Sequence, residues 1–569
     1  MDIGIKIVIA VVVILVLIGI KMVCDEKARR KRMREFLINS WGKSADRNYL
    51  EEQWNAIVSY YKVLEKKAEE SQKHQFVDDI TWNDLDMDEV YQVWNHTRTS
   101  IGEEYLYAAL RRPIASDAEM EERERVITYL LENTQERMYL QEALAEIGKL
   151  ERMSVYDHLE LIQDMKPIGA LPHILAGVCL VGALIGCAFA PEFMVIASIV
   201  IMGGNIISYY QAKAKVDSYI RLFTFILHMV EQCEGVARKS IPGLEKYQDQ
   251  LKKQTSCFGK YRRFCFLVNG GSGMSGDIMD SLMDYIRILF HVDLVKMSTM
   301  IREAKKYEQQ LRIMYDTIGY LDTMLSTASC RIMYGEYCVP QLSHQANGKF
   351  AVTEMYHPLI PEGVRNSITA ERSVLLTGSN ASGKSTFIKT VALNAILAQT
   401  LHTVLAENYQ ASWFCIASSM ALRDDILSQE SYYIVEIRSL KRILDLTRSS
   451  ELPVLCFIDE VLRGTNTVER IAASSRILQA IAEQGGLCFA ATHDIELTYL
   501  LEKEYDNYHF EEQVEDDKVT FDYCLREGRA CTRNAIRLLK MLGYDEKIVD
   551  DANERVALFL KSGNWVPSH

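Results

Sequence analysis

The chain has 569 residues, which is enough for several domains with separate cores. Its formal net charge of −13 argues against a generally basic, DNA-coating surface, although a local basic stripe is compatible with it. The thirteen cysteines are odd in number and lack C-x-x-C pairs, so they indicate neither a disulfide framework nor a zinc site.

The first predicted element is an N-terminal membrane anchor. Hydrophobic residues make up 48% of the chain, yet mean hydropathy is only −0.06, so the apolar excess is concentrated locally. Ile7 to Ile20 is an apolar run that, with its neighbours, approaches the ~20 residues needed to span a bilayer. A cleaved signal peptide is the alternative, but no small-residue cleavage site follows. We therefore expect residues 1–24 to be a transmembrane anchor.

A basic cluster, Lys27–Arg34, follows this run. The positive-inside rule predicts that the cluster stays in the cytoplasm and that residues 25–79 form a cytoplasmic linker or helical segment. Contact with DNA is a second interpretation of the cluster. A topology signal or a contact with anionic lipid is the interpretation that its position beside an anchor favours.

A second apolar stretch covers residues 168–210 and is broken at Ala190-Pro191-Glu192. Each half is nearly long enough to cross a membrane, so the stretch predicts a transmembrane helical hairpin. Lys166 on one flank, and Lys213 with Lys215 on the other, place both ends in the cytoplasm. A buried hairpin in a soluble protein is the alternative, because short apolar runs are ambiguous. We expect a multi-pass protein of the cell membrane, with the lipid bilayer as one partner.

Long helices are predicted on both sides of the hairpin. Residues 120–165 and 212–330 are rich in Glu, Lys, Leu, Met and Arg, with apolar residues at helical spacing. An example is Leu222-x-x-Phe225-Ile226-x-x-Met229.

A phosphate-binding loop follows the apolar strand Ser373–Leu376 and precedes a helix-like segment that starts at Thr386. In such loops glycines turn backbone N–H groups toward the phosphates, a lysine reaches the β and γ oxygens, and a hydroxyl at the helix start ligates Mg²⁺. The chain is thus predicted to bind ATP with Mg²⁺, and the binding residues are Gly378, Ser379, Asn380, Ala381, Ser382, Gly383, Lys384, Ser385 and Thr386.

Two further strands end in residues suited to nucleotide hydrolysis. The run Leu452–Ile458 leads into Asp459 and Glu460, the pattern of a Walker B strand. Asp459 is predicted to bind Mg²⁺ together with Ser385, and Glu460 to orient or deprotonate the attacking water. The strand Leu487–Ala491 runs into His493, a candidate sensor of the γ-phosphate at the edge where open α/β sheets bind ligands.

These motifs together resemble the MutS family of mismatch-repair ATPases. The phosphate loop with its Asn380, the segment from Asp459 to Thr467, and Ala491-Thr492-His493 follow that family's order. The segment 424–436 resembles the family's signature, in which the serine matching Ser431 acts on the nucleotide of the opposite subunit. The resemblance therefore implies a homodimer, and it implies that Asn380 contacts the phosphates.

The resemblance also reaches upstream and covers residues 80 to 555. Its upstream motifs are similar to the start of the family's core, to its return helix and to the segment before the ATPase domain: Asn95-x-Thr97-x-Thr99-Ser100-x-Gly102, Leu321-Asp322-x-x-Leu325-Ser326-x-Ala328, and Tyr356-His357-Pro358-Leu359. It implies core helices in residues 80–167, lever and core helices in residues 211–345, and an ATPase domain in residues 346–569. DNA is the partner that the resemblance implies.

The chain departs from the family pattern in its mismatch-recognition region, in the predicted hairpin and in the signature segment. Nothing before residue 80 has the length of the family's mismatch-recognition and connector domains, and that stretch contains no Phe-x-Glu motif of the kind that probes a mispair. The predicted hairpin occupies a stretch where the family carries soluble core and lever helices. Gln429-Glu430 stands where a Gly-Arg pair is common in the signature, so we expect the contact across the dimer to differ in detail. We therefore expect DNA binding without a recognisable mismatch reader.

The fold class predicted from these observations is a C-terminal α/β P-loop ATPase domain of ABC type, a mostly α-helical core and lever domain, an N-terminal transmembrane helix and a transmembrane hairpin. The predicted function is a membrane-anchored, dimeric ATPase in which Lys384, Glu460 and His493 are catalytic. Two alternatives have no DNA role: a transport-type ATPase and an ATP-dependent scaffold at the membrane. Three predicted spans are few for a translocation path, and no Leu-Ser-Gly-Gly-Gln signature occurs.

Overall fold

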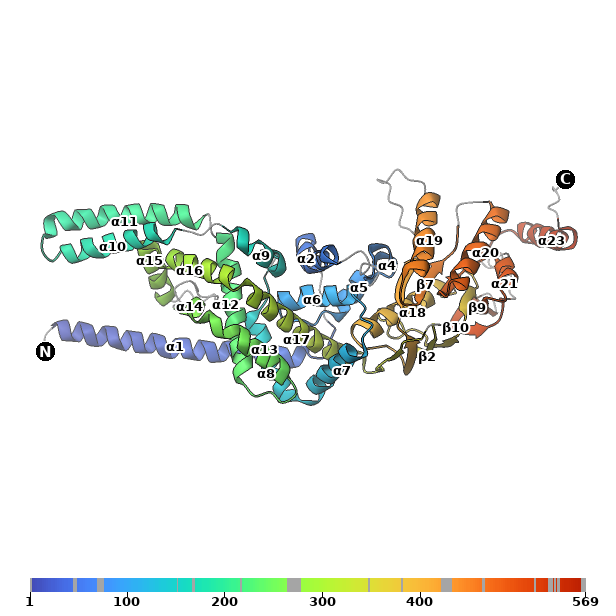
Figure 1. Ribbon diagram of the computed structural model, residues 1–569, viewed down its shortest axis with the longest axis horizontal. Helices are drawn as coiled ribbons and strands as arrows, with labels where there is room; N and C mark the ends of the chain where they lie inside the picture. Colours follow the sequence, from blue (N-terminus) through green and yellow to red (C-terminus); the bar gives the residue numbers. More distant parts are fainter. Residues whose placement is uncertain are drawn as a thin grey trace. The chain divides into compact units, whose positions relative to one another are not determined.

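The computed structural model describes residues 3–44, 49–68, 76–150, 152–165, 169–214, 217–263, 278–345, 348–379, 382–420, 432–462, 466–515, 518–530, 536, 539 and 543–563. The chain divides into two compact units, which we describe separately (Figure 1). The helical unit comprises Met1–Ala68, Tyr91–Ala109 and Glu122–Met333. The sheet unit comprises Glu69–Val90, Leu110–Glu121 and Tyr334–His569.

Helices make up the first part of the chain. They are α1 (Ile3–Ser40), α2 (Glu51–Lys67), α4 (Asp79–Asp84), α5 (Met87–Trp94), α6 (Ser100–Arg111), α7 (Asp117–Glu132), α8 (Thr134–Ile147), α9 (Val155–Leu161), α10 (Ala170–Gly186), α11 (Pro191–Lys213), α12 (Asp217–Arg238), α13 (Glu245–Thr255), α14 (Gly259–Arg262), α15 (Ile278–Phe290), α16 (Val292–Lys306) and α17 (Glu308–Tyr334), with short 3₁₀ turns at Ile162–Asp164 and Ser256–Phe258. The prediction of a large helical region is confirmed. In α12 the four apolar residues at helical spacing are all buried, as the pattern predicts.

Helix α1 is continuous from Ile3 to Ser40 and so carries both the apolar run and the basic cluster. The cluster packs on α8 through ion pairs: Arg29 Nη2 lies 2.7 Å from Glu146 Oε1, and Arg34 Nε lies 3.4 Å from Glu142 Oε1. Leu37, at the end of the helix, is fully buried. Two charges of the cluster are therefore paired at the surface of the helical unit.

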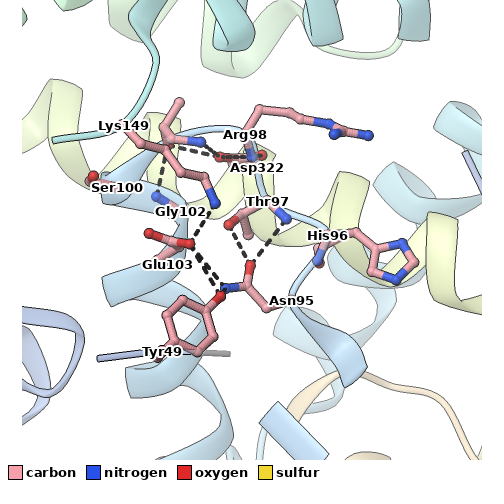
Figure 2. A network of polar contacts seen from close by, with 12 residues as sticks. Tyr49, Asn95, His96, Thr97, Arg98, Ser100, Gly102, Glu103, Lys149 and Asp322 are labelled. Atoms are coloured by element: carbon pink, nitrogen blue, oxygen red, sulfur yellow. Dashed lines mark hydrogen bonds and ion pairs between the residues drawn. The ribbon is translucent and has the colours of Figure 1, made fainter. Parts of the chain in front are cut away.

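The motif that begins at Asn95 forms a buried polar network with helix α17 (Figure 2). The Asp322 carboxylate, fully buried on α17, accepts hydrogen bonds from the Arg98 and Thr99 backbone N–H groups at 2.9–3.0 Å and from Thr99 Oγ1 at 2.7 Å. Gly102 packs against this carboxylate so closely that an added Cβ would lie 2.2 Å from Asp322 Oδ2. The network joins the start of α6 to the middle of α17, and its glycine is required by space.

Helices α10 and α11 lie side by side as a hairpin that extends from the helical unit (Figure 1). The hairpin exposes large apolar side chains, for example Phe189 at 86% and Phe193 at 77%. Among the described residues, α11 alone is a helix long and apolar enough to cross a membrane by length and composition; 17% of its apolar window is buried, and α10 is shorter. Such a helix is weak evidence by itself, so the predicted membrane crossing stays a prediction.

The sheet unit contains two sheets, and the mixed α/β class is confirmed. Its strands are β1 (Gln341–Ser343), β2 (Phe350–Met355), β3 (Asn366–Ala370), β4 (Ser373–Thr377), β5 (Asn408–Ser412), β6 (Cys415–Ser419), β7 (Val454–Asp459), β8 (Leu487–Ala491), β9 (Tyr505–Glu515) and β10 (Lys518–Glu527); its further helices are α18 (Lys384–Thr400), α19 (Tyr432–Ser449), α20 (Thr467–Glu483), α21 (Ile495–Leu500) and α23 (Glu546–Ser562). The smaller sheet has the order β1-β5-β2-β3, and the larger has the order β10-β9-β4-β8-β7-β6.

In the larger sheet, β9, β4, β8, β7 and β6 run parallel, and β10 is antiparallel to β9. The central strands β4, β8 and β7 are buried along nearly their whole length, because both faces of the sheet are covered there. Alternate residues of β7, Cys456 and Ile458, join a core cluster with side chains of α19 and α20, such as Leu440 and Leu478. Helix α4 packs on the edge strand β6, where Ser418 Oγ donates to Asp84 Oδ2 at 2.6 Å.

Candidate nucleotide-binding site

The strand order places the three predicted motifs at neighbouring strand ends. Strand β8 lies between β4 and β7, and Ala491 at its end is in register with Leu376 on one side and Asp459 on the other. The carboxyl ends of parallel strands meet at one edge of the sheet, where open α/β sheets bind ligands. The phosphate loop follows β4, Asp459 and Glu460 end β7, and His493 follows β8.

The phosphate loop closes on its own backbone. Lys384 Nζ donates to the carbonyl oxygens of Gly378 at 2.8 Å and Ser379 at 2.7 Å, and Ser382 Oγ donates to Ser379 O at 2.8 Å. Gly378 and Gly383 have φ of 140° and 99°. A Cβ at Gly378 would lie 2.8 Å from Phe510 O, so both conformation and space require glycine there.

Helix α18 begins directly after this loop, at Lys384, with Gly383 as its N-cap residue. Ser385 and Thr386 are exposed in its first turn, while Lys384 is buried. A helix N-terminus with free N–H groups and a positive dipole end binds phosphate well. The described part of the loop therefore has the form of a phosphate cradle.

The end of β7 presents two carboxylates in different environments. Within the described part of the chain, Asp459 Oδ1 is buried and has no hydrogen-bond partner. A buried carboxylate oxygen without a partner is costly unless a cation binds it, and Mg²⁺ prefers such oxygen ligands. Asp459, with the exposed Ser385 hydroxyl, thus has the donor chemistry of a Mg²⁺ site.

Glu460 is placed by a strained turn. Its φ is 54°, in the left-handed region that non-glycine residues rarely adopt, and its N–H donates to Ala491 O at 3.0 Å. Its Oε1 lies 3.0 Å from His493 Nε2, and the two side chains are 17% and 37% exposed. The turn thus brings Glu460 and His493, predicted separately from the sequence, into contact.

The segment that carries His493 is held from both ends. Thr492 N–H donates to Leu376 O at 2.9 Å, and Asp494 N–H donates to Thr492 Oγ1 at 3.0 Å. Asp494 also binds Arg470 of α20 through two hydrogen bonds of 2.6 and 2.9 Å, and this interaction raises the pKa of the Arg470 guanidinium. Such bidentate pairs fix geometry as well as charge.

One aromatic residue at the site was missed by the sequence reasoning. Tyr523 of β10, 45% exposed and with φ of 54°, lies against the phosphate loop, where a Cβ on Gly383 would be 3.0 Å from Tyr523 Cδ1. Phe521 stacks on its ring with a centroid distance of 6.0 Å. No local pattern could have found it, because its position depends on β10 pairing with β9 and on the register shift between Phe521 and Leu525.

Several predicted site residues cannot be placed. Asn380, Ala381 and Ser431 lie outside the described residues, as do residues 424–430 of the signature and 463–465 of the loop after Walker B. Their roles stay predictions. Helix α19 begins at Tyr432, directly after Ser431, and Asn466 caps α20 by accepting a hydrogen bond from Val468 N–H at 2.9 Å.

Comparisons with known proteins point to one family. The family model of MutS domain V matches residues 374–559. The chain is 24% identical over 521 residues to the DNA mismatch repair protein MutS of Streptococcus sanguinis, covering 82% of this chain and 59% of that protein. It is 24% identical over 535 residues to MutS of Streptococcus suis, covering 84% and 61%. To MutS of Natronomonas pharaonis it is 31% identical over 245 residues, covering 42% and 28%.

The chain thus spans less than two thirds of the length of these relatives. The two streptococcal matches nevertheless extend far beyond domain V and cover most of this chain. The matched domain contains the phosphate loop, the Walker B strand and His493. These matches support membership of the MutS family.

Proposed function

We propose that this chain is an ATPase that binds ATP with Mg²⁺ and hydrolyses it. The observation that carries the proposal is the 3.0 Å contact between Glu460 and His493 at the sheet edge where the Lys384 loop also lies. Binding of the phosphates requires neither Glu460 nor His493. Hydrolysis requires a group that orients and deprotonates the attacking water.

The proposed roles combine the sequence motifs with the contacts of each residue. Lys384 and the loop N–H groups bind the phosphates, and Lys384 exchanges its bonds to Gly378 and Ser379 for bonds to phosphate oxygens. Glu460 orients the attacking water and accepts its proton. His493 holds the Glu460 carboxylate through Nε2 and contacts the γ-phosphate.

Asp459 and Ser385 would hold Mg²⁺, which neutralises charge on the phosphate oxygens when bound. The unpartnered Asp459 Oδ1 supports this assignment. Tyr523 is proposed as the platform on which the nucleobase stacks, because it is an exposed aromatic ring directly beside Gly383.

Dimerisation is proposed from the family resemblance of the signature, in which Ser431 completes the site of the opposite subunit. The test mixes a Ser431→Ala chain with a Lys384→Ala chain. If sites are shared, one composite site of the mixed dimer keeps both residues and turnover is partly restored. If each subunit works alone, mixing two inactive chains restores nothing.

Membrane anchoring by residues 1–24 and 168–210, with the sheet unit in the cytoplasm, is also a proposal. The exposed apolar side chains of α10 and α11 support it. Two native thiols test it in intact cells: Cys187 at the hairpin tip and the exposed Cys524 of the sheet unit. A membrane-impermeant maleimide is expected to label Cys187 from outside, and Cys524 only after lysis. Labelling of Cys524 in intact cells to the same extent as Cys187 would contradict the topology, and so would protection of Cys187 until lysis.

DNA binding is proposed because the relatives are DNA mismatch repair proteins. The experiment measures ATP turnover of the detergent-solubilised chain with and without duplex, mismatched and branched DNA, across a salt series. Stimulation that weakens as salt rises is expected, since phosphate contacts release counterions. ATP turnover with no stimulation and no salt-sensitive binding would favour the membrane scaffold or transport alternative.

A further inference from the structure

The turn that carries Glu460 is strained at two positions. Glu460 has φ of 54° and Leu462 has φ of 59°, and neither is glycine. Left-handed backbone at a non-glycine residue costs free energy, so it persists only where surrounding contacts fix it. Two such residues within three positions require strong support from neighbouring elements.

Three contacts supply this support, each from a different element. Glu460 N–H is held by Ala491 O of β8 at 3.0 Å, and Ser474 Oγ of α20 donates to Val461 O at 3.4 Å. The third is made by Glu436 on the second turn of α19, whose Oε1 accepts a hydrogen bond from Leu462 N–H.

The third contact is the unusual one. Glu436 is only 7% exposed and Leu462 only 2%. Burying a carboxylate is expensive, and a backbone N–H can be satisfied at lower cost by a carbonyl oxygen or water. A buried glutamate that reaches a loop N–H on another element therefore points to a positional requirement at Leu462.

We propose that Glu436 is a positioning residue for Glu460. By holding Leu462 N–H, it keeps Leu462 and Glu460 in their left-handed conformations and so keeps the Glu460 carboxylate against His493. The inference rests on the proposed role of Glu460 in hydrolysis. Because Glu436 belongs to α19, a displacement of that helix is transmitted to Glu460 through this bond.

The test compares three substitutions of Glu436. Glu436→Gln keeps an oxygen acceptor of the same reach without the charge. Glu436→Asp keeps the charge but is one methylene too short, and Glu436→Leu removes the acceptor at similar volume. Glu483→Leu, which changes an exposed glutamate on α20, is the matched control.

Steady-state kcat and KM for ATP are measured with nucleotide affinity and Tm for each variant. Glu436→Asp and Glu436→Leu are expected to lower kcat about 10- to 100-fold, because small misplacements of catalytic groups cost this much. KM and nucleotide affinity stay within about twofold, as expected for an effect on the reaction rather than on binding. Glu436→Gln and Glu483→Leu keep kcat within about threefold, since neither removes the acceptor.

A double-mutant cycle separates positioning from a general loss of structure. In a Glu460→Gln background, Glu436→Leu is expected to lower kcat no further, because both changes act on one group. If Glu436→Leu does not fold, comparing kcat of Glu436→Asp with that of Glu436→Gln decides whether Glu436 has the positioning role. Wild-type kcat in Glu436→Asp, or a loss in Glu436→Gln equal to that in Glu436→Asp, would overturn the proposal.

The failure of this inference is distinguishable from failure of the proposed function. If Glu460→Gln abolishes turnover while the Glu436 variants remain active, only the positioning role is wrong. If Glu460→Gln itself hydrolyses ATP at the wild-type rate, the catalytic role of Glu460 is wrong, and the positioning role falls with it.

Discussion

Substituting Gly102 by alanine tests the buried network that joins α6 to α17. The new Cβ would lie 2.2 Å from Asp322 Oδ2, 2.6 Å from Cγ and 2.9 Å from Cβ, and it would meet a side chain held by four donor contacts (Figure 2). Asp322 would have to move by about 1 Å to reach ordinary contact distance, which breaks or stretches bonds to Arg98 and Thr99.

The expected loss in the free energy of unfolding is the sum of two contributions, overpacking and lost hydrogen bonds. Overpacking a filled core costs about 1–3 kcal/mol, and each lost hydrogen bond to a buried charged group costs a further ~1.5–3 kcal/mol. With one of the four hydrogen bonds lost, Gly102→Ala should destabilise the helical unit by about 2.5–6 kcal/mol, a large share of the ~5–15 kcal/mol that stabilises a typical domain.

The assay is urea unfolding of the solubilised chain, followed by fluorescence of tryptophans such as the buried Trp94, whose carbonyl accepts a hydrogen bond from Ser326 of α17. Gly259→Ala is the matched control, because a Cβ there meets nothing within 4 Å and its φ is not positive. The control should be neutral or slightly stabilising. A loss below about 1 kcal/mol in Gly102→Ala would refute the close contact with Asp322.

Three further predictions concern the nucleotide site and the helical unit. Tyr523→Ala should weaken ATP binding about tenfold while Tyr523→Phe retains it, since ring stacking and not the hydroxyl is needed; fluorescent-nucleotide titration checks this. Arg470→Met should lower kcat with little change in KM, because Asp494 would lose its two hydrogen bonds beside His493; equal kcat would contradict the support role. The hydrogen bonds from Arg125 lower the pKa of Glu122 to about 2. Their contribution to stability is therefore present above pH ~4.5 and is lost as the pH falls toward 2. In acid unfolding, the free energy of unfolding of Glu122→Gln should fall less between pH ~4.5 and ~2 than that of the wild-type chain.

Local patterns were sufficient to predict the parts of the site built from consecutive residues. The glycines, Lys384 and Ser385 form one strand–loop–helix unit, and the carboxylates after β7 follow a single buried strand. The sequence also placed His493 at the strand edge where such sheets bind ligands, but its contact with Glu460 was not predicted, because it depends on β8 lying beside β7.

Contacts between distant segments could not be predicted in this way. Asp322 meets Arg98 across 224 residues of sequence, and Tyr523 reaches the phosphate loop only because of the pairing of β9 with β10. The bond between Glu436 and Leu462 depends on how α19 packs beside the Walker B strand. Each of these positions is set by tertiary packing, on which the composition and spacing of nearby residues carry no information.

Hydrolysis by Glu460 is tested most directly by ATP turnover of the wild-type chain and of Glu460→Gln, each with Mg²⁺ and after chelation. The account predicts Mg²⁺-dependent turnover in the wild-type chain. In Glu460→Gln it predicts a loss of about 100-fold or more with ATP affinity unchanged, because a general base contributes about this much. Equal turnover in both chains, or turnover that persists without Mg²⁺, would contradict the account.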